Sequence, residues 1–141
     1  MKNTKQIGNI TEAQCQLAFM QNGYNVLTPF GDCERYDFVV DINNTFLRIQ
    51  CKTASPTDEE NTGFKFSCRS RNVEDGKTKM HKYSKEEIDY FATFFDNKCY
   101  LIPVEECGCD KRLRLLPPKN GQTRGINWAK NYEIEEVLKQ Y

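Results

Sequence analysis

The chain has 141 residues, 38% of them hydrophobic, and its 20 Lys and Arg balance its 20 Asp and Glu. This length and composition exclude an extensively disordered chain and suit one domain over residues 1–141 with a core of its own. No apolar run approaches the roughly 20 residues that span a bilayer, and no signal peptide follows the N-terminus. We therefore expect a cytoplasmic protein without a membrane segment.

The chain contains seven cysteines, an odd number that favours free thiols over a disulfide framework in a cytosolic protein. Cys15, Cys51 and Cys99 lie in helix- or strand-like patterns and are expected in the core. Cys107-Gly108-Cys109 is the one pair that suggests a metal, but zinc usually takes four ligands and His81 is the only histidine. A thiol or zinc protein remains an alternative.

The N-terminal half begins with a predicted helix. Apolar residues recur at helical spacing over residues 5–22, and Gly23 is suited to end this helix. A short strand is expected within 24–31, before a Pro/Gly turn. Two further strands follow over 36–42 and 45–52.

The second half is predicted to begin with a third strand over 63–70, where Phe64, Phe66 and Cys68 alternate with polar residues. Residues 71–82 are expected to form a polar, basic loop. Ser84 and Glu87 have the spacing of a capping box, which predicts a helix over 84–95.

The rest of the chain is predicted to hold a strand near 98–106, an extended segment over 111–118 and a short closing helix over 133–140. We expect a core over about 5–105 and a basic C-terminal extension over 106–141. The order of these elements predicts an α/β layered domain.

The predicted helix over 84–95 carries more aromatic residues than one buried stripe requires. Two alternatives remain open for them, a subunit interface and a deeply buried helix. The residues concerned are Tyr90, Phe91, Phe94 and Phe95.

Asn43-Asn44 suits a two-residue turn with positive φ, and this turn sets the register of the hairpin around it. One face then pairs apolar residues: Val40 with Leu47, Phe38 with Ile49, and Tyr36 with Cys51. The other face pairs Asp37 with Gln50, and Lys52 follows on the same side because strand side chains alternate. This face is either a solvated surface or a site.

Two segments collect basic residues in this neutral chain, 69–82 and 111–130. Such segments are compatible with a nucleic-acid groove, although the charges alone favour an ordinary solvated surface. The candidate DNA-binding residues are Arg69, Arg71, Lys77, Lys79, Lys82, Arg112, Arg114, Lys119 and Arg124.

Three short stretches give the chain a recognisable pattern: the helix segment GNITE at 8–12, Tyr36-Asp37, and the triplet Gln50-Cys51-Lys52. The pattern resembles the PD-(D/E)xK nuclease superfamily, most of all its group I intron-associated homing endonuclease branch. The resemblance implies an αβββαβ core with a central mixed sheet flanked by helices. Two departures are Tyr36 in place of the motif's proline and Gln50 in place of its second acid.

The resemblance also implies a metal-dependent DNA endonuclease that hydrolyses phosphodiester bonds. Its catalytic residues would be Glu12, Asp37, Gln50 and Lys52. Its ligands for Mg²⁺ or Mn²⁺ would be Asp37, Gln50, the backbone carbonyl of Cys51, and Glu12. The implied partner is double-stranded DNA, and we expect a homodimer or homotetramer because one site cuts one strand at a time.

Two other functions on the same fold remain open. One is a non-catalytic DNA-binding module, and the other is a structure-specific nuclease similar to the junction resolvases. The sequence does not choose between one and two metal ions, and it does not indicate the DNA target.

Overall fold

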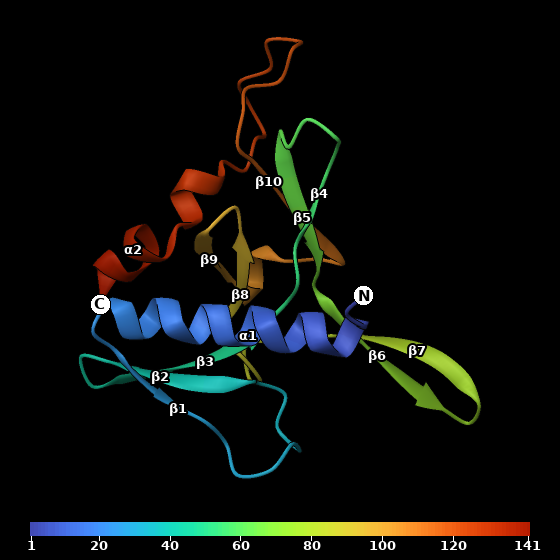
Figure 1. Cartoon of the computed structure of the whole chain (residues 1–141), viewed down its shortest axis with the longest axis vertical. Coiled ribbons are helices and arrows are strands. Elements are labelled where there is room, and N and C mark those ends of the chain that lie inside the picture. The colour runs from blue at the N-terminus through green and yellow to red at the C-terminus, as the bar shows by residue number, and fades with distance from the viewer.

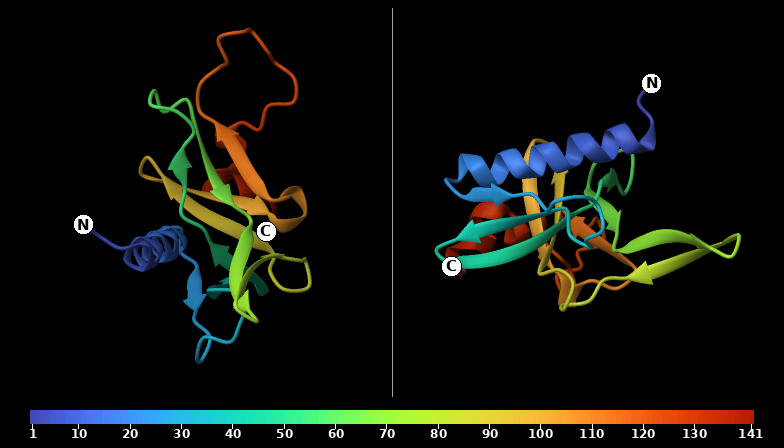
Figure 2. Two further views of the ribbon diagram at one scale, coloured as in Figure 1. Left: turned by 90° about the vertical axis from the view of Figure 1, so that its right-hand side faces the viewer. Right: turned by 90° about the horizontal axis from the view of Figure 1, so that it is seen from below.

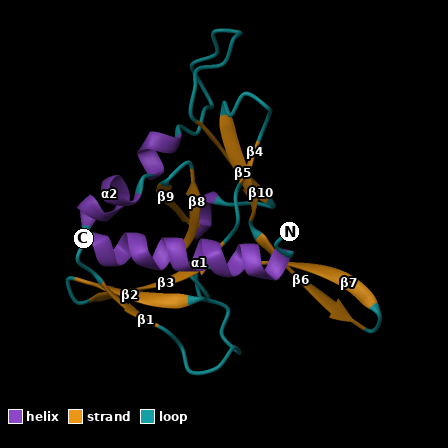
Figure 3. Cartoon of the chain, in the orientation of Figure 1, coloured by secondary structure: helices purple, strands orange, loops and turns teal.

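The computed structural model describes all 141 residues, and Figures 1 and 3 show the arrangement of helices and strands. The helices are α1 (Thr4–Gln21) and α2 (Ile134–Val137), with 3₁₀ turns at Val104–Glu106, Ala129–Tyr132 and Leu138–Gln140. The strands are β1 (Asn25–Leu27), β2 (Phe38–Ile42), β3 (Thr45–Cys51), β4 (Ser55–Pro56), β5 (Gly63–Ser67), β6 (Arg69–Glu74), β7 (Lys77–Lys82), β8 (Tyr90–Phe95), β9 (Lys98–Pro103) and β10 (Asp110–Arg114). No helix is long and apolar enough to span a membrane.

The main sheet has five strands in the order β1-β2-β3-β8-β9. Its neighbours are antiparallel except β3 and β8, which run parallel and align Gln50 with Phe91. The sheet is therefore mixed, as the family resemblance implies. The parallel pair places the end of β3, with its polar triplet, in the middle of the sheet.

Helix α1 lies across one face of the main sheet (Figure 1). It begins with a reciprocal capping box between Asn3 and Gln6, and Gly23 follows it with a φ of 86°. This confirms the predicted helix and its glycine stop. Cys15 and Phe19 are fully buried against the strands, where the rings of Phe19 and Phe38 meet edge-to-face at 5.8 Å. One core therefore lies between α1 and the sheet.

The β2–β3 hairpin turns at Asn43-Asn44, whose φ values are 50° and 70°. Its register is the predicted one from Ile42–Thr45 to Phe38–Ile49, and its apolar face is buried. The predicted pair of Tyr36 with Cys51 is wrong. Regular pairing ends at Phe38, and Tyr36 turns toward a second core while Cys51 packs against the first.

A second, three-stranded sheet of β4, β5 and β10 covers the opposite face of β8 and β9. Alternation along β8 explains this arrangement, because Tyr90 and Ala92 face the first core whereas Phe91 faces the second. Phe64 and Phe66 of β5 complete the second core. The predicted strand over 63–70 is thus confirmed, but it lies in this outer sheet rather than beside β3.

The predicted helix over 84–95 is wrong. The capping interaction forms, since the Ser84 N–H donates to Glu87 Oε1 at 2.9 Å, but it closes only a turn. Residues 90–95 form β8, because both of its faces are covered and its aromatic residues suit a buried strand. Tyr90 and Phe91 are 6% and 1% exposed, and Phe94 and Phe95 are half-buried. Because these residues lie on a strand, both alternatives that placed them on a helix are wrong.

The predicted loop over 71–82 is also wrong. Residues 69–82 form the β6–β7 hairpin, with all six residue pairs in register from Arg69–Lys82 to Glu74–Lys77. Asp75 and Gly76, with φ values of 52° and 72°, form its turn. Asp-Gly is a strong hairpin signal. The prediction of a loop followed the polar, basic composition of the segment instead. The hairpin projects from the body of the protein (Figures 1 and 2).

The three elements predicted near the C-terminus are confirmed in type, the first two over shorter ranges. β9 and β10 occupy the predicted strand and extended segment, and α2 with the 3₁₀ turn Leu138–Gln140 forms the closing helical segment. Ile134 and Leu138 are buried in the first core. The domain is therefore α/β, with one long helix, a mixed five-stranded sheet and a small outer sheet.

Candidate active site

The predicted polar face of the β2–β3 hairpin is anchored by main-chain hydrogen bonds. The Asp37 N–H donates to the Ile49 carbonyl at 2.8 Å, which extends the hairpin by one bond. The Cys51 N–H donates to Asp37 Oδ2, also at 2.8 Å. The carboxylate of Asp37 is therefore fixed beside the triplet at the end of β3, with its second oxygen, Oδ1, unengaged by the backbone.

Lys52 is fixed along its whole length. Its N–H donates to the Ala92 carbonyl at 2.9 Å, and its carbonyl accepts the Thr93 hydroxyl at 2.6 Å, so β8 holds its backbone. Its ammonium Nζ donates to the Arg69 carbonyl at 2.8 Å. The lysine thus bridges the main sheet and the base of the β6–β7 hairpin.

Burial and neighbouring charges shift the pKa values of three site residues. Burial raises the pKa of Asp37, against the Cys51 N–H bond and the Lys52 charge, which lower it. Burial lowers the pKa of Lys52, and the charge of Asp37 opposes that shift. The pKa of Glu12 on α1 is raised by burial and then by the charge of Asp37. The structure therefore brings Asp37 within electrostatic reach of both Glu12 and Lys52.

Gln50 is half-buried next to these residues. Its amide nitrogen lies 3.5 Å from the Cys51 carbonyl, which is longer than the usual range for a hydrogen bond. Its side-chain oxygen, Oε1, accepts no hydrogen bond from the protein and can serve as a ligand.

The donor set suits a hard divalent cation. Asp37, Glu12, the Gln50 amide and the Cys51 carbonyl all offer oxygen, which Mg²⁺ and Mn²⁺ prefer. The structure holds no group of three or more His, Cys, Asp or Glu side chains arranged for a metal, and its seven cysteines are unbonded to one another. The zinc alternative therefore has no ligand set.

Arg35 fastens the β6–β7 hairpin to the body beside this site. Its Nε pairs with Glu87 at 2.8 Å, Nη1 donates to the Ser70 hydroxyl at 2.7 Å, and Nη2 donates to the Lys82 carbonyl at 2.9 Å. Its guanidinium also stacks 3.9 Å above the ring of Tyr83. Nothing in the sequence pattern singles out Tyr83, because the contact depends on segments that are 48 residues apart.

Arg48, on the same face of the hairpin, has a structural role. It pairs with Asp89 at 3.1 Å and donates to the carbonyls of Lys85 and Glu86, which closes the turn before β8. It forms no hydrogen bond or ion pair with the candidate catalytic side chains.

The basic residues of the two predicted segments differ in exposure. Arg71, Lys77, Lys79 and Lys82 are exposed on the β6–β7 hairpin, whereas Arg69 is half-buried at its base. In the second segment, Arg112, Lys119 and Arg124 are exposed and Arg114 is half-buried. Lys111 is buried and donates to the Glu106 carbonyl at 3.2 Å.

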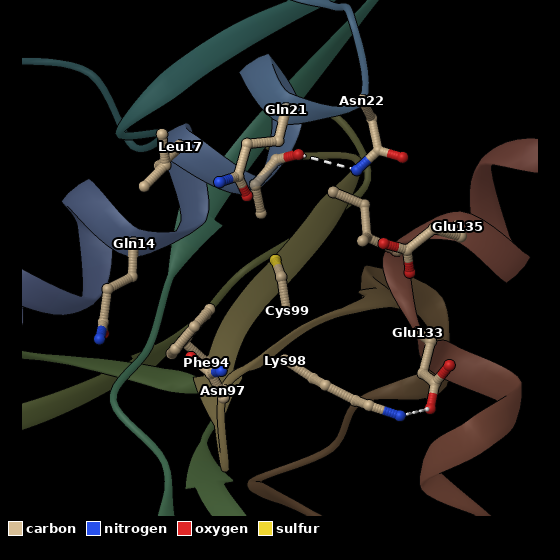
Figure 4. A pocket seen from close by; sticks show the side chains of 12 residues that line it. Gln14, Leu17, Gln21, Asn22, Phe94, Asn97, Lys98, Cys99, Glu133 and Glu135 are labelled. Carbon is tan, nitrogen blue, oxygen red and sulfur yellow. Dashed lines mark hydrogen bonds and ion pairs between the residues drawn. The ribbon is translucent and has the colours of Figure 1, made fainter.

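A cavity of about 460 Å³ lies elsewhere, between the end of α1, the β8–β9 turn and the C-terminal segment. Figure 4 shows Gln14 and Leu17 on one side of it and the ion pair of Lys98 with Glu133 on the other. None of the candidate catalytic residues lines this cavity. Cys99, Glu133 and Glu135 also line it, but Cys99 is buried and Glu133 is paired with Lys98. The chemistry is therefore assigned to the end of β3, where the Asp37 carboxylate lies beside Lys52.

Two comparisons relate the chain to known proteins. The family model described as PD-(D/E)XK endonuclease matches residues 2–135. The fold is similar to that of a bacterial homing endonuclease, I-Ssp6803I, with a TM-score of 0.78 and 19% sequence identity over 99% of this chain and 95% of that one. At this identity the likeness shows a shared fold. No curated protein matches the sequence.

Proposed function

Since the chain belongs to the PD-(D/E)XK endonuclease family, and is thus a phosphodiester hydrolase, we propose that it is a divalent-metal-dependent endonuclease that cuts double-stranded DNA. The observation that carries this proposal is the bond from the Cys51 N–H to Asp37, which fixes a carboxylate beside Lys52 and within electrostatic reach of Glu12. An acid, an amide and a lysine on an ordinary surface strand would lack this anchoring.

Hydrolysis adds the oxygen of water to phosphorus, breaks one P–O ester bond and leaves a proton on the departing sugar oxygen. Negative charge develops on the phosphate oxygens during this step. We assign Lys52 to stabilise that charge, because its ammonium is held by the Arg69 carbonyl and its position is fixed before substrate arrives. Lys52 therefore acts as an electrostatic group with little freedom to move.

Asp37, the Gln50 amide oxygen and the Cys51 carbonyl would hold Mg²⁺ or Mn²⁺, with Glu12 as a further acidic ligand from α1. When bound, the cation supplies Lewis-acid polarisation of the phosphate and lowers the pKa of a coordinated water. Gln50 in place of an acid makes the site less negative by one charge. We therefore expect weaker metal affinity than a site with three carboxylates would have.

The β6–β7 hairpin is the proposed main contact with DNA. A two-stranded ribbon fits the major groove, and the exposed cations of this one can neutralise phosphates on either side. The residues assigned to DNA are Arg69, Arg71, Lys77, Lys79 and Lys82, together with Arg112, Arg114, Lys119 and Arg124 from the C-terminal part. A homing-endonuclease-like action on a long duplex target fits this extended surface.

We further propose that residues 1–141 form one cytoplasmic domain that assembles as a homodimer or homotetramer. One chain has one candidate site, so two chains are required to cut both strands of a duplex together. Light scattering at micromolar concentration, with and without duplex DNA, tests this proposal. A strict monomer in both conditions would contradict it.

The central test is cleavage of duplex plasmid and branched DNA with Mg²⁺, with Mn²⁺ and with EDTA. Cleavage of duplex DNA that EDTA stops, and that Asp37→Ala and Lys52→Ala each abolish, supports the proposal. Cleavage of branched DNA alone would favour the structure-specific nuclease. DNA binding without cleavage in either metal would favour the non-catalytic module.

A further inference from the structure

The outer face of the β4-β5-β10 sheet carries two cations in direct register. Phe64 and Phe66 point into the second core, so the alternate residue Lys65 lies on the other face. On that face Arg112 lies opposite Lys65, and Lys65 lies opposite Ser55. These three residues form one row across the sheet, the Ser55–Lys65–Arg112 row.

Neither cation of the row has an ionic partner within 4.0 Å. The one acidic side chain of the neighbouring row, Asp110, lies opposite Ser67 and forms no ion pair with Lys65 or Arg112. Like charges directly opposite each other on antiparallel strands are destabilising. The free protein therefore carries an electrostatic cost that an anion bound at this row would relieve.

The row lines a hollow of about 270 Å³ that also includes Thr53 and Asp110. Thr53 directly follows the candidate catalytic residue Lys52, and its hydroxyl oxygen lies 3.1 Å from that of Thr11 on α1. The hollow therefore adjoins the candidate active site, and the left view of Figure 2 faces the small sheet that carries it.

We propose that this hollow is a phosphate-binding subsite, which holds a DNA backbone phosphate next to the one that is cut. The inference rests on the proposed function. Lys65 supplies a point charge, Arg112 a planar fork of donors, and Ser55 and Thr53 hydroxyl donors. Two cations and the carboxylate of Asp110 leave a net charge of one positive unit, which matches the single negative charge of a phosphodiester.

The affinity for duplex DNA in EDTA, measured against salt concentration, tests the subsite. Lys65→Gln combined with Arg112→Gln should reduce the slope of log affinity against log salt by about 0.9, the value for one lost phosphate contact. Lys85→Gln is the matched control, because Lys85 is exposed near the start of β8 and forms no ion pair. An unchanged slope and affinity in the double variant would overturn the proposal.

Two further measurements do not depend on cleavage. In low salt without DNA, Lys65→Gln should raise the midpoint of thermal unfolding, since it removes one of two opposed charges. An unchanged or lower midpoint would contradict the proposed repulsion between Lys65 and Arg112. If orthophosphate stabilises the wild type through Lys65 while the DNA salt slope is unchanged, the hollow binds free phosphate and the DNA assignment fails.

The outcome for the subsite is separable from that for the nuclease. A wild type that cuts no DNA in Mg²⁺ or Mn²⁺, but whose salt slope still falls on replacement of Lys65 and Arg112, would overturn the proposed catalysis and keep the phosphate site.

Discussion

Two hairpins of this protein, β2–β3 and β6–β7, have the same kind of turn and opposite surroundings. Each turns through two residues with positive φ, Asn43-Asn44 in the first and Asp75-Gly76 in the second. The first hairpin buries one whole face, where Phe38 is 0% exposed. The second is exposed along both faces, and even Val73 is 73% exposed. Turn chemistry makes a hairpin, but burial decides how firmly it is held.

This difference matches the tasks proposed for the two hairpins. Catalytic groups must be held within a fraction of an ångström, and β2–β3 achieves this because the core fixes its register. A DNA-contacting ribbon has to adapt to its substrate. β6–β7 is therefore fastened at its base by Arg35, while its tip stays in solvent. Lys52, bonded to the Arg69 carbonyl, is the point where the two hairpins meet.

The largest expected contrast between the hairpins is in stability. Phe38→Ala should lower the free energy of unfolding by about 3–5 kcal/mol, because it leaves a cavity in the first core. Val73→Ala, on the exposed ribbon, should change it by less than about 0.5 kcal/mol. Urea unfolding of both variants checks the pair. Equal effects would mean that β6–β7 packs against other parts of the protein.

The next contrast is in cleavage. Asp37→Asn keeps a side-chain oxygen that can accept the Cys51 N–H bond but removes the charge. We expect cleavage to fall by about 10²–10³-fold, as for loss of one electrostatic group in an active site, with little change in DNA affinity. Asp41→Asn is the control, since Asp41 shares the polar face near the turn. If both variants lost cleavage activity to a similar extent, Asp37 would not be distinguished from an ordinary acidic residue on this face.

The third contrast concerns the base of the ribbon. Arg35→Ala removes charged hydrogen bonds to Ser70, the Lys82 carbonyl and Glu87, each of a kind worth about 1.5–3 kcal/mol. Hydrogen exchange of the β6–β7 amides should therefore become faster, while amides of β2–β3 keep their protection. Arg71→Ala, which removes an exposed cation from the same ribbon, should leave both patterns unchanged. Protection lost equally in both hairpins would show that Arg35 supports the whole fold.

The sequence predicts the β2–β3 hairpin well because its information is local. Asn43-Asn44 sets the turn, and period-2 apolar residues set the buried face, so Asp37, Gln50 and Lys52 follow by alternation. The same local reasoning failed at residues 84–95. There the Ser84–Glu87 capping pattern competed with burial on both faces of β8, and tertiary burial prevailed.

Contacts between distant segments could not be read from the sequence. Arg35 stacks on Tyr83, and Lys65 lies opposite Arg112. The two residues of each pair are 47 or more positions apart in the sequence. Glu12 is an intermediate case. Its place near Asp37 is implied by the family resemblance, and burial and then the charge of Asp37 raise its pKa, but its catalytic role stays a prediction.

The smallest expected effect is on the stability of the metal-free protein, which the buried charge of Asp37 lowers. The pKa of Asp37 is raised in the fold, chiefly by burial. The folded state therefore binds a proton at this carboxyl more tightly than the unfolded state does. Such a group contributes stability at a pH below the usual value of 3.8, and this contribution is lost as the pH rises through the folded pKa.

At pH 7 in EDTA, Asp37→Asn should therefore unfold at a higher urea concentration than the wild type. The difference should narrow as the pH falls through the raised pKa of Asp37, because the wild-type carboxylate then takes up its proton. Urea unfolding between pH 4 and pH 8 measures this, with Asp41→Asn as the control for loss of an acid. A variant less stable than the wild type at pH 7 would mean that the bond to Cys51 and the attraction of Lys52 outweigh burial, and that the site is electrostatically satisfied without metal.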